Sequence, residues 1–131
     1  MPGRPDFVLL IIMSDACGHC VNFKSNQLDI LKKRIAKEYD RVAVKEITLP
    51  SFSSPLPENY PSSLQKIIGW FPMFILFEGG DDWCDPSKKN KNKSLPNFIV
   101  FNGEISNGKP QIKSKYPLNS ESILKWMETG N

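Results

Sequence analysis

The sequence is poor in the residues that cross-link chains or hold metals, with three cysteines and one histidine among 131 residues. Three cysteines cannot all pair within one chain, so we expect no framework of structural disulfides. A structural zinc site normally takes four protein ligands. The only imidazole, His19, lies inside the cysteine pair Cys17 and Cys20, which disfavours a metal site. No apolar stretch approaches the roughly 20 residues that span a bilayer, so no membrane segment is expected.

An excess of one charge is also lacking outside one short run. The formal net charge is +3, and residues 88–93 hold four lysines, so the rest of the chain carries 3 − 4 = −1. A nearly neutral body disfavours binding to nucleic acid or to a membrane surface. With 40% hydrophobic and 24% charged residues, the composition is typical of a soluble globular protein. We expect a monomer with a single domain over residues 1–131.

The first apolar run, residues 7–13, has no polar position. Such a run is typical of a central strand that is covered on both faces. It is short for a secretory signal peptide, and no cleavage site of small residues follows it. We therefore favour a buried strand and leave the cellular location unassigned.

The remaining elements follow from apolar spacing and from turn residues. One long amphipathic helix should begin near the cysteine pair, with the buried residues Val21, Leu28, Leu31 and Ile35. Further strands are predicted at residues 42–47, 71–77, 98–101 and 111–115, and further helices at 64–68 and from a capping Ser120 to 127. Between them lie a proline-rich surface connection, residues 49–61, and an exposed polar loop at about residues 79–96. This order predicts an α/β fold in which a central mixed sheet is flanked by helices.

Cys17 and Cys20 stand three positions apart at the start of the predicted helix, a spacing that lets the two sulfurs form a reversible disulfide. At a helix start, unpaired N–H groups and the positive end of the dipole favour a thiolate, the attacking species in disulfide exchange. Cys20, one turn inside, should keep its proton until it resolves the mixed disulfide. Gly18 and His19 are the candidate tuning residues between them. His19 can carry charge near neutral pH, which tilts the couple towards oxidising its partner.

Each of these residues also has a plainer interpretation. The pair is either two inert cysteines or half of a zinc site, and His19 is a solvated residue without influence. Cys84, in the polar loop, is expected to be a free surface thiol, with a regulatory or intermolecular thiol as the minority alternative.

Three features together resemble the thioredoxin fold: a strand, Cys-Gly-His-Cys at the start of a long helix, and a proline before an apolar strand. The tetrapeptide is that of protein disulfide isomerase domains. The resemblance covers about residues 6–127 and implies a thioredoxin-like fold that lacks the opening strand and helix of full thioredoxins. In that family a cis proline packs beside the cysteine pair, helps to bind the substrate backbone and excludes metal. Pro72 is the favoured candidate, because Pro96 lies much farther from Cys20, and the implied substrate groove comprises Ala16, Phe71 and Pro72.

Two positions depart from the pattern of that family. The family places an acid in the first strand, where it assists proton transfer from the inner cysteine, but Ile11 stands six positions before Cys17 here. The aromatic residue that usually precedes the first cysteine is replaced by Ala16. Both departures predict slower exchange, although the pair can still cycle.

The leading hypothesis is a protein thiol-disulfide oxidoreductase of the protein disulfide isomerase type, in which Cys17 attacks and Cys20 resolves. Its partners would be protein thiols and disulfides and a separate redox partner, and it would need no cofactor or metal beyond the Cys17–Cys20 disulfide. The missing acid motivates a second hypothesis, a binding module of the same fold that recognises a client protein without turnover. A metal or iron-sulfur carrier, bridged between two chains by Cys17, is the third.

Overall fold

Strand β1 (Phe7–Ser14) lies inside the sheet, between two neighbouring strands, in the computed structural model, which describes residues 5–129. It pairs in parallel with β2 (Val42–Leu49) and antiparallel with β3 (Met73–Glu78). The sheet has the order β2-β1-β3-β4-β5-β6 and ends with the antiparallel strands β4 (Phe98–Val100), β5 (Gly103–Ser106) and β6 (Lys109–Ile112). The expected α/β architecture with a central mixed sheet is therefore confirmed.

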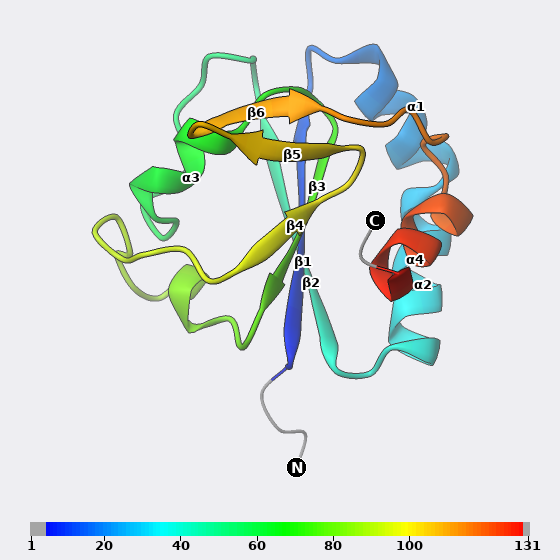
Figure 1. Cartoon of the computed structure of the whole chain (residues 1–131), viewed down its shortest axis with the longest axis horizontal. Coiled ribbons are helices and arrows are strands. Elements are labelled where there is room, and N and C mark those ends of the chain that lie inside the picture. The colour runs from blue at the N-terminus through cyan, green and yellow to red at the C-terminus, as the bar shows by residue number, and fades with distance from the viewer. Residues whose placement is uncertain (1–4, 130–131) are drawn as a thin grey trace.

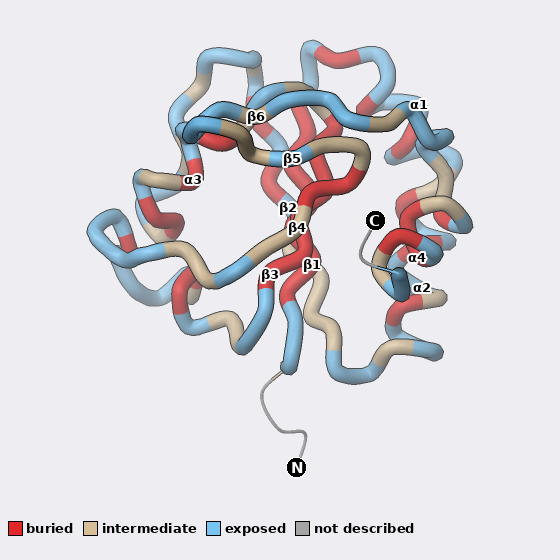
Figure 2. The backbone as a smooth tube through the Cα atoms, in the orientation of Figure 1, coloured by how far each residue is buried: buried red, intermediate tan, exposed pale blue. Residues whose placement is uncertain are grey.

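Each face of the sheet is covered by its own set of helices (Figure 1). One face carries α1 (Gly18–Asn26), α2 (Leu28–Glu38) and α4 (Ser120–Thr129), and the other carries α3 (Ser62–Ile67). Because side chains alternate along a strand, Leu9 and Ile11 enter the core under the first set, while Val8 and Leu10 enter the core under α3. Figure 2 shows the buried backbone concentrated in β1 and β3. This two-sided cover explains why residues 7–13 lack a polar position.

The segment after the cysteines forms two helices where the sequence predicts one. Gln27, between α1 and α2, leaves the helical conformation (φ −124°, ψ −29°), and its side chain accepts a hydrogen bond from the Ser120 N–H at 3.0 Å. This hydrogen bond connects the break between α1 and α2 to the start of α4. The first helix buries Cys20 and Phe23, so Val21, expected to be buried, is 52% exposed. Both helices are short, and among residues 5–129 no helix is long and apolar enough to cross a membrane.

Two boundaries near the end of the chain also differ from the predictions. Asn102 and Asn107 form the turns that the sequence indicates, with φ values of 62° and 54°. A four-residue strand, β5, lies between them, and its pairing partner β6 starts at Lys109, ahead of the predicted residues 111–115. Helix α4 is capped by Asn119, whose Oδ1 accepts a hydrogen bond from the Ser122 N–H at 2.8 Å, so the predicted cap at Ser120 is wrong by one residue.

The segment 79–96, expected to be an exposed loop, is partly built into the core. Trp83 and Cys84 lie in a short 3-10 helix, η1 (Asp82–Cys84), and both are buried. The ring centroids of Trp83 and Phe77 are 4.4 Å apart, so this segment extends the cover that α3 provides. Cys84 is 1% exposed, and burial raises the pKa of its thiol to about 11. Cys84 is a free thiol as expected, but its expected surface position is wrong. The four lysines of the segment are exposed as predicted.

Replacing Trp83 with alanine should destabilise the whole domain and not only the loop that carries it. Truncating a buried aromatic side chain lowers the free energy of unfolding by about 3–5 kcal/mol. Urea unfolding, followed by far-ultraviolet circular dichroism, would measure this change. Lys88→Ala, on the exposed part of the same segment, is the matched control and should change the free energy by less than about 0.5 kcal/mol. Equal effects of the two substitutions would contradict the burial of Trp83.

Candidate active site

Cys17 lies in the short turn between the end of β1 and the first turn of α1. The Ser14 carbonyl accepts a hydrogen bond from the Cys17 N–H at 3.1 Å, and the Ser14 hydroxyl accepts one from the Ala16 N–H at 3.2 Å. Asp15 donates its N–H to the Leu49 carbonyl at 2.9 Å, at the end of β2. The turn is therefore fixed to both parallel strands, and the position of Cys17 follows from the sheet.

The Cys17 sulfur caps helix α1. Cys17 has an extended backbone (φ −105°, ψ 118°), and its Sγ accepts a hydrogen bond from the Cys20 N–H at 3.3 Å. The first N–H groups of a helix have no partner within the helix, and a side-chain acceptor usually satisfies one of them. Here a sulfur takes the place of the usual oxygen. The helix start therefore supplies a hydrogen-bond donor directly to the candidate nucleophile.

Cys20 is the more enclosed member of the pair. Both thiols are free, and Cys17 is 7% exposed while Cys20 is 2% exposed. Burial and the hydrogen bond with Cys17 raise the pKa of Cys20 to about 12, against the lowering effect of the Ser14 N–H, which lies 3.5 Å from the Cys20 sulfur. Cys20 therefore remains a thiol at neutral pH, in agreement with the prediction that it keeps its proton.

Phe71 and Pro72 lie beside Cys17, although they are more than 50 residues away along the chain. The Cys17 S–H donates to the Phe71 carbonyl at 3.5 Å. The Phe71–Pro72 peptide bond is cis, whereas the bond before Pro96 is not. Antiparallel pairing places Met73, the first residue of β3, opposite Ile12 of β1. This register brings the residues before β3 to the end of β1, where Cys17 follows.

A groove of about 570 Å³ opens beside Cys17. Ala16, Gly18 and His19 are exposed in its lining, and Phe71 is half-buried there. A Cβ atom at Gly18 would meet nothing within 4 Å, so the space next to the helix start is open. The lining residues that the sequence analysis did not identify are Phe52, Gln65, Ile68, Gly69 and Trp70.

Phe52 and Trp70 are the large groove residues that sequence reasoning missed. Phe52 is 57% exposed, and its ring centroid lies 5.2 Å from that of Phe71. Trp70 packs across Gly103, where a Cβ atom would lie 2.4 Å from the indole ring. The signal for Trp70 was its place directly before Phe71. Phe52 offered only an apolar ring in a surface connection, and nothing local indicated which element it faces.

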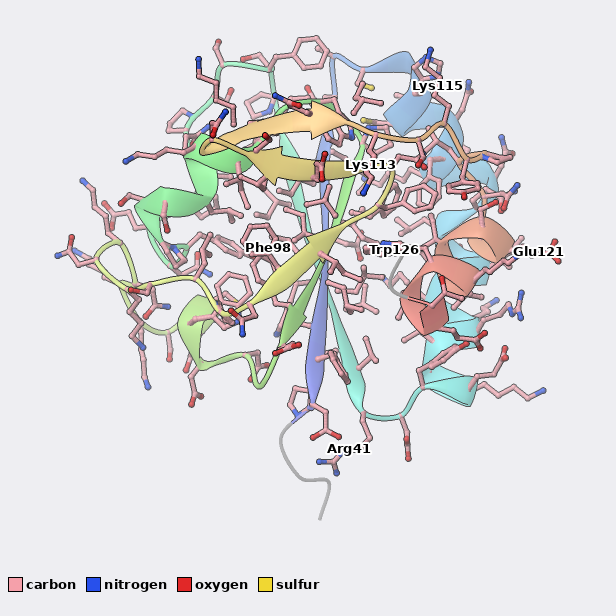
Figure 3. All side chains as sticks on the ribbon, in the orientation of Figure 1. Arg41, Phe98, Lys113, Lys115, Glu121 and Trp126 are labelled. Carbon is pink, nitrogen blue, oxygen red and sulfur yellow. The ribbon has the colours of Figure 1, made fainter. Side chains whose placement is uncertain are left out.

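A second groove, of about 430 Å³, shares His19, Trp70 and Phe71 with the first and also contains Pro72. Three exposed apolar side chains after β5 complete much of its lining, namely Ile112, Tyr116 and Leu118. Figure 3 shows Lys115, from the same segment, beside the N-terminal end of α1. The two grooves meet at Phe71 and leave room for an extended polypeptide next to Cys17.

Ile11 lies in the buried cluster that contains both cysteines, and it is fully buried. It pairs with Phe74 of β3. An isoleucine cannot accept a proton, so this position offers no group to take the Cys20 proton, as the sequence predicts.

We infer the chemistry of the site from the geometry of its residues. Within residues 5–129, no three His, Cys, Asp or Glu side chains are grouped so that they could hold a metal ion. Neither a scan against models of known protein families nor a search of curated proteins finds a match to this chain. A capped sulfur, a protonated thiol one turn away and an open groove are suited to the exchange of thiols and disulfides.

Alkylation should distinguish the three thiols. With iodoacetamide at pH 8, we expect Cys17 to be modified first, because it lines an open groove, while Cys20 and Cys84 stay unmodified, because burial raises the pKa of both. Mass spectrometry of tryptic peptides after timed quenching would give the three rates. Since thiols react as thiolates, labelling of Cys20 and Cys84 in the folded protein should rise only as the pH approaches their raised pKa values. In 8 M urea all three should react alike, and equal rates in the folded protein would contradict the arrangement.

Proposed function

We propose that this chain is a protein thiol-disulfide oxidoreductase with a thioredoxin-like fold, in which Cys17 is the nucleophile and Cys20 the resolving thiol. The observation that carries the proposal is the hydrogen bond from the Cys20 N–H to the Cys17 sulfur at the start of α1. This N–H is placed to donate to the sulfur that would act as the attacking thiolate. Cys20, held as a thiol by burial, supplies the second sulfur of the pair.

The thioredoxin-like part of the proposal is supported by the arrangement of the elements. A strand, the cysteine pair at a helix start and a parallel second strand follow in order, and a cis proline precedes the antiparallel strand β3. The β5–β6 hairpin and the segment 79–96 are additions to this frame in the described part of the chain.

Reduction of a client would proceed in two steps. The Cys17 thiolate attacks one sulfur of the client disulfide, the client S–S bond breaks, and the released client sulfur takes a proton from solvent. Cys20 then loses its proton and attacks the Cys17 sulfur, which releases the second client thiol and leaves the Cys17–Cys20 disulfide. Two electrons pass from the pair to the client, and a separate dithiol restores the pair. Run in reverse, the same steps oxidise a client dithiol.

The proton of Cys20 has to leave without help from a carboxylate at Ile11. Either the departing client thiolate or a water molecule receives it, so we expect the resolving step to limit the rate. The same observation supports the second candidate, a binding module that holds a client in the grooves without turnover.

A Cys20→Ser variant separates the two candidates. With the resolving sulfur removed, an active enzyme incubated with an oxidised model protein should accumulate a covalent adduct through Cys17, at least tenfold above the wild type. Non-reducing electrophoresis would detect the adduct, and dithiothreitol should release it. The Cys17→Ser/Cys20→Ser double variant, with circular dichroism to check its fold, is the control and should give none. Absence of the adduct in the single variant would leave only the binding module.

The direction of electron flow follows from how strongly the reduced pair is stabilised. His19 is exposed in the first turn of α1, where a positive charge would favour the thiolate and make the disulfide a stronger oxidant. We therefore expect a midpoint potential nearer the roughly −180 mV of protein disulfide isomerase than the roughly −270 mV of thioredoxin.

Equilibration in glutathione buffers, with acid quenching and mass measurement after alkylation, would give this potential. Replacing His19 with alanine should lower it by about 30 mV, equivalent to about 1.4 kcal/mol. A wild-type midpoint near that of thioredoxin would rule out the oxidising assignment and leave the exchange chemistry intact.

A further inference from the structure

The proline-rich connection, residues 49–61, forms one wall of a third pocket, of about 600 Å³, whose other wall is α3. Its lining is largely apolar and combines three of the four prolines of the segment, Pro55, Pro57 and Pro61, with two larger side chains, Leu56 and Tyr60. Tyr60 is 8% exposed and Leu56 is half-buried, so the apolar floor belongs to the core under α3. The sequence predicts this segment as a mere surface connection.

The third pocket lies next to the groove of Cys17. Gln65 of α3 lines both, and its Oε1 accepts a hydrogen bond from the Leu56 N–H at 3.2 Å. This bond holds the proline-rich segment against α3 at the boundary between the two depressions. A chain that leaves the Cys17 groove past Gln65 therefore enters the third pocket directly.

Hydrogen bonds from the segment 79–96 fix the shape of the third pocket. The buried Asn90 donates its amide N–H to the Asn59 carbonyl at 2.8 Å, and Asn59 in turn donates its amide to the Cys84 carbonyl at 2.9 Å. The Ser62 N–H donates to the Lys91 carbonyl at 3.0 Å, which brings a lysine to the start of α3. Proline also limits the conformations of the wall. The pocket is therefore held in place before any ligand arrives.

The charged side chains around this pocket are mainly positive. Lys66 and Lys91 are exposed in its lining, and Glu58, the acid among the lining residues, lies 3.7 Å from Lys89 outside the lining. An apolar floor with two cations at its edge is complementary to an apolar side chain that is accompanied by a carboxylate.

From these observations we infer that the third pocket is a docking site for the client polypeptide, and that it takes an apolar side chain next to an Asp or Glu, at a distance from the client cysteine that engages Cys17. This inference rests on the proposed function, because the site positions a client for exchange at Cys17. The pocket would make this chain selective among disulfides, since a small disulfide reaches Cys17 without contacting Lys66 or Lys91.

Binding can be measured without exchange chemistry. Synthetic peptides would carry one serine in place of the client cysteine and a Leu-Glu pair four, six or eight residues before or after it. Titrated into the Cys17→Ser protein, the best peptide should shift the amide resonances of Ser62, Gln65 and Lys66 in heteronuclear NMR spectra. The matched peptide with Gly-Gln should bind about three- to tenfold more weakly. Equal affinities for every matched pair would overturn the inference.

A charge substitution on the protein completes the test. Lys66→Gln/Lys91→Gln should weaken binding of the Leu-Glu peptide about three- to fivefold and leave the Leu-Gln peptide nearly unchanged, which is a coupling between the two charge changes. The matched control, Lys33→Gln/Lys37→Gln on α2, removes the same charge on the opposite face of the sheet and should have no effect. An equal loss for the two peptides, or an equal loss in the control variant, would also overturn the inference.

Kinetics separate failure of the docking site from failure of the proposed function. For the wild type, KM should be lower for a disulfide made from the Leu-Glu cysteine peptide than for one made from the Gly-Gln peptide, and the lysine double variant should abolish this difference. The rate with the small uncharged disulfide bis(2-hydroxyethyl) disulfide should be the same in both proteins. Normal turnover of the small disulfide without peptide preference would overturn the docking site alone. No turnover of any disulfide, together with selective peptide binding, would overturn the proposed oxidoreductase and leave a binding module.

Discussion

The hydrogen bond from the Cys20 N–H to the Cys17 sulfur is the contact on which the proposed function depends. It requires that α1 begin immediately after Cys17, and this start is set by the turn that Ser14 ties to the end of β1. The same end of the sheet receives the residues before β3, so the Phe71 carbonyl reaches the same sulfur. A single atom thus lies where a helix start, a parallel strand pair and an antiparallel strand converge. Ligands commonly bind at such sheet ends, because backbone groups there point outwards with a common direction.

The two thiols differ in their surroundings because they occupy different positions at the start of α1. Cys17 precedes the helix and faces a groove, whereas Cys20 points into the cluster of Ile11, Phe23 and Phe74. Burial raises the pKa of Cys20, so a large part of the difference between the proposed nucleophile and the proposed resolving thiol arises from hydrophobic packing. The same buried cluster offers no proton acceptor at the position of Ile11, because the isoleucine side chain is apolar. In the proposed cycle, a core that is dry enough to keep Cys20 protonated therefore also slows the step in which Cys20 must ionise.

Much of the frame and the centre of the site could be predicted from the sequence, because they depend on short-range patterns. The uninterrupted apolar run of β1, the spacing of Cys17 and Cys20, and the proline before β3 each carry a local signal. The misses have a common cause in long-range contacts. The break at Gln27 depends on a bond to Ser120 that lies 93 residues away, and the burial of Cys84 depends on Phe77 and Tyr60 packing against its neighbour Trp83. A polar composition predicted exposure for the segment 79–96, but a few apolar side chains were enough to anchor it.

That anchoring links the stability of the domain to the surface beside the candidate active site. The face of the sheet under α3 is covered partly by Trp83 and Cys84 and partly by Tyr60 of the proline-rich segment, and Asn90 joins the two segments. Helix α3 has six residues and would be a marginal helix by itself, so these segments support it as much as it supports them. Gln65, on this helix, forms part of the groove of Cys17. Side chains that shield the core from water therefore also hold the walls of the groove and of the third pocket in place. A change in either segment should alter these walls and the stability of the domain together, whereas a change in the exposed Lys66 or Lys91 should alter only the charge at the third pocket.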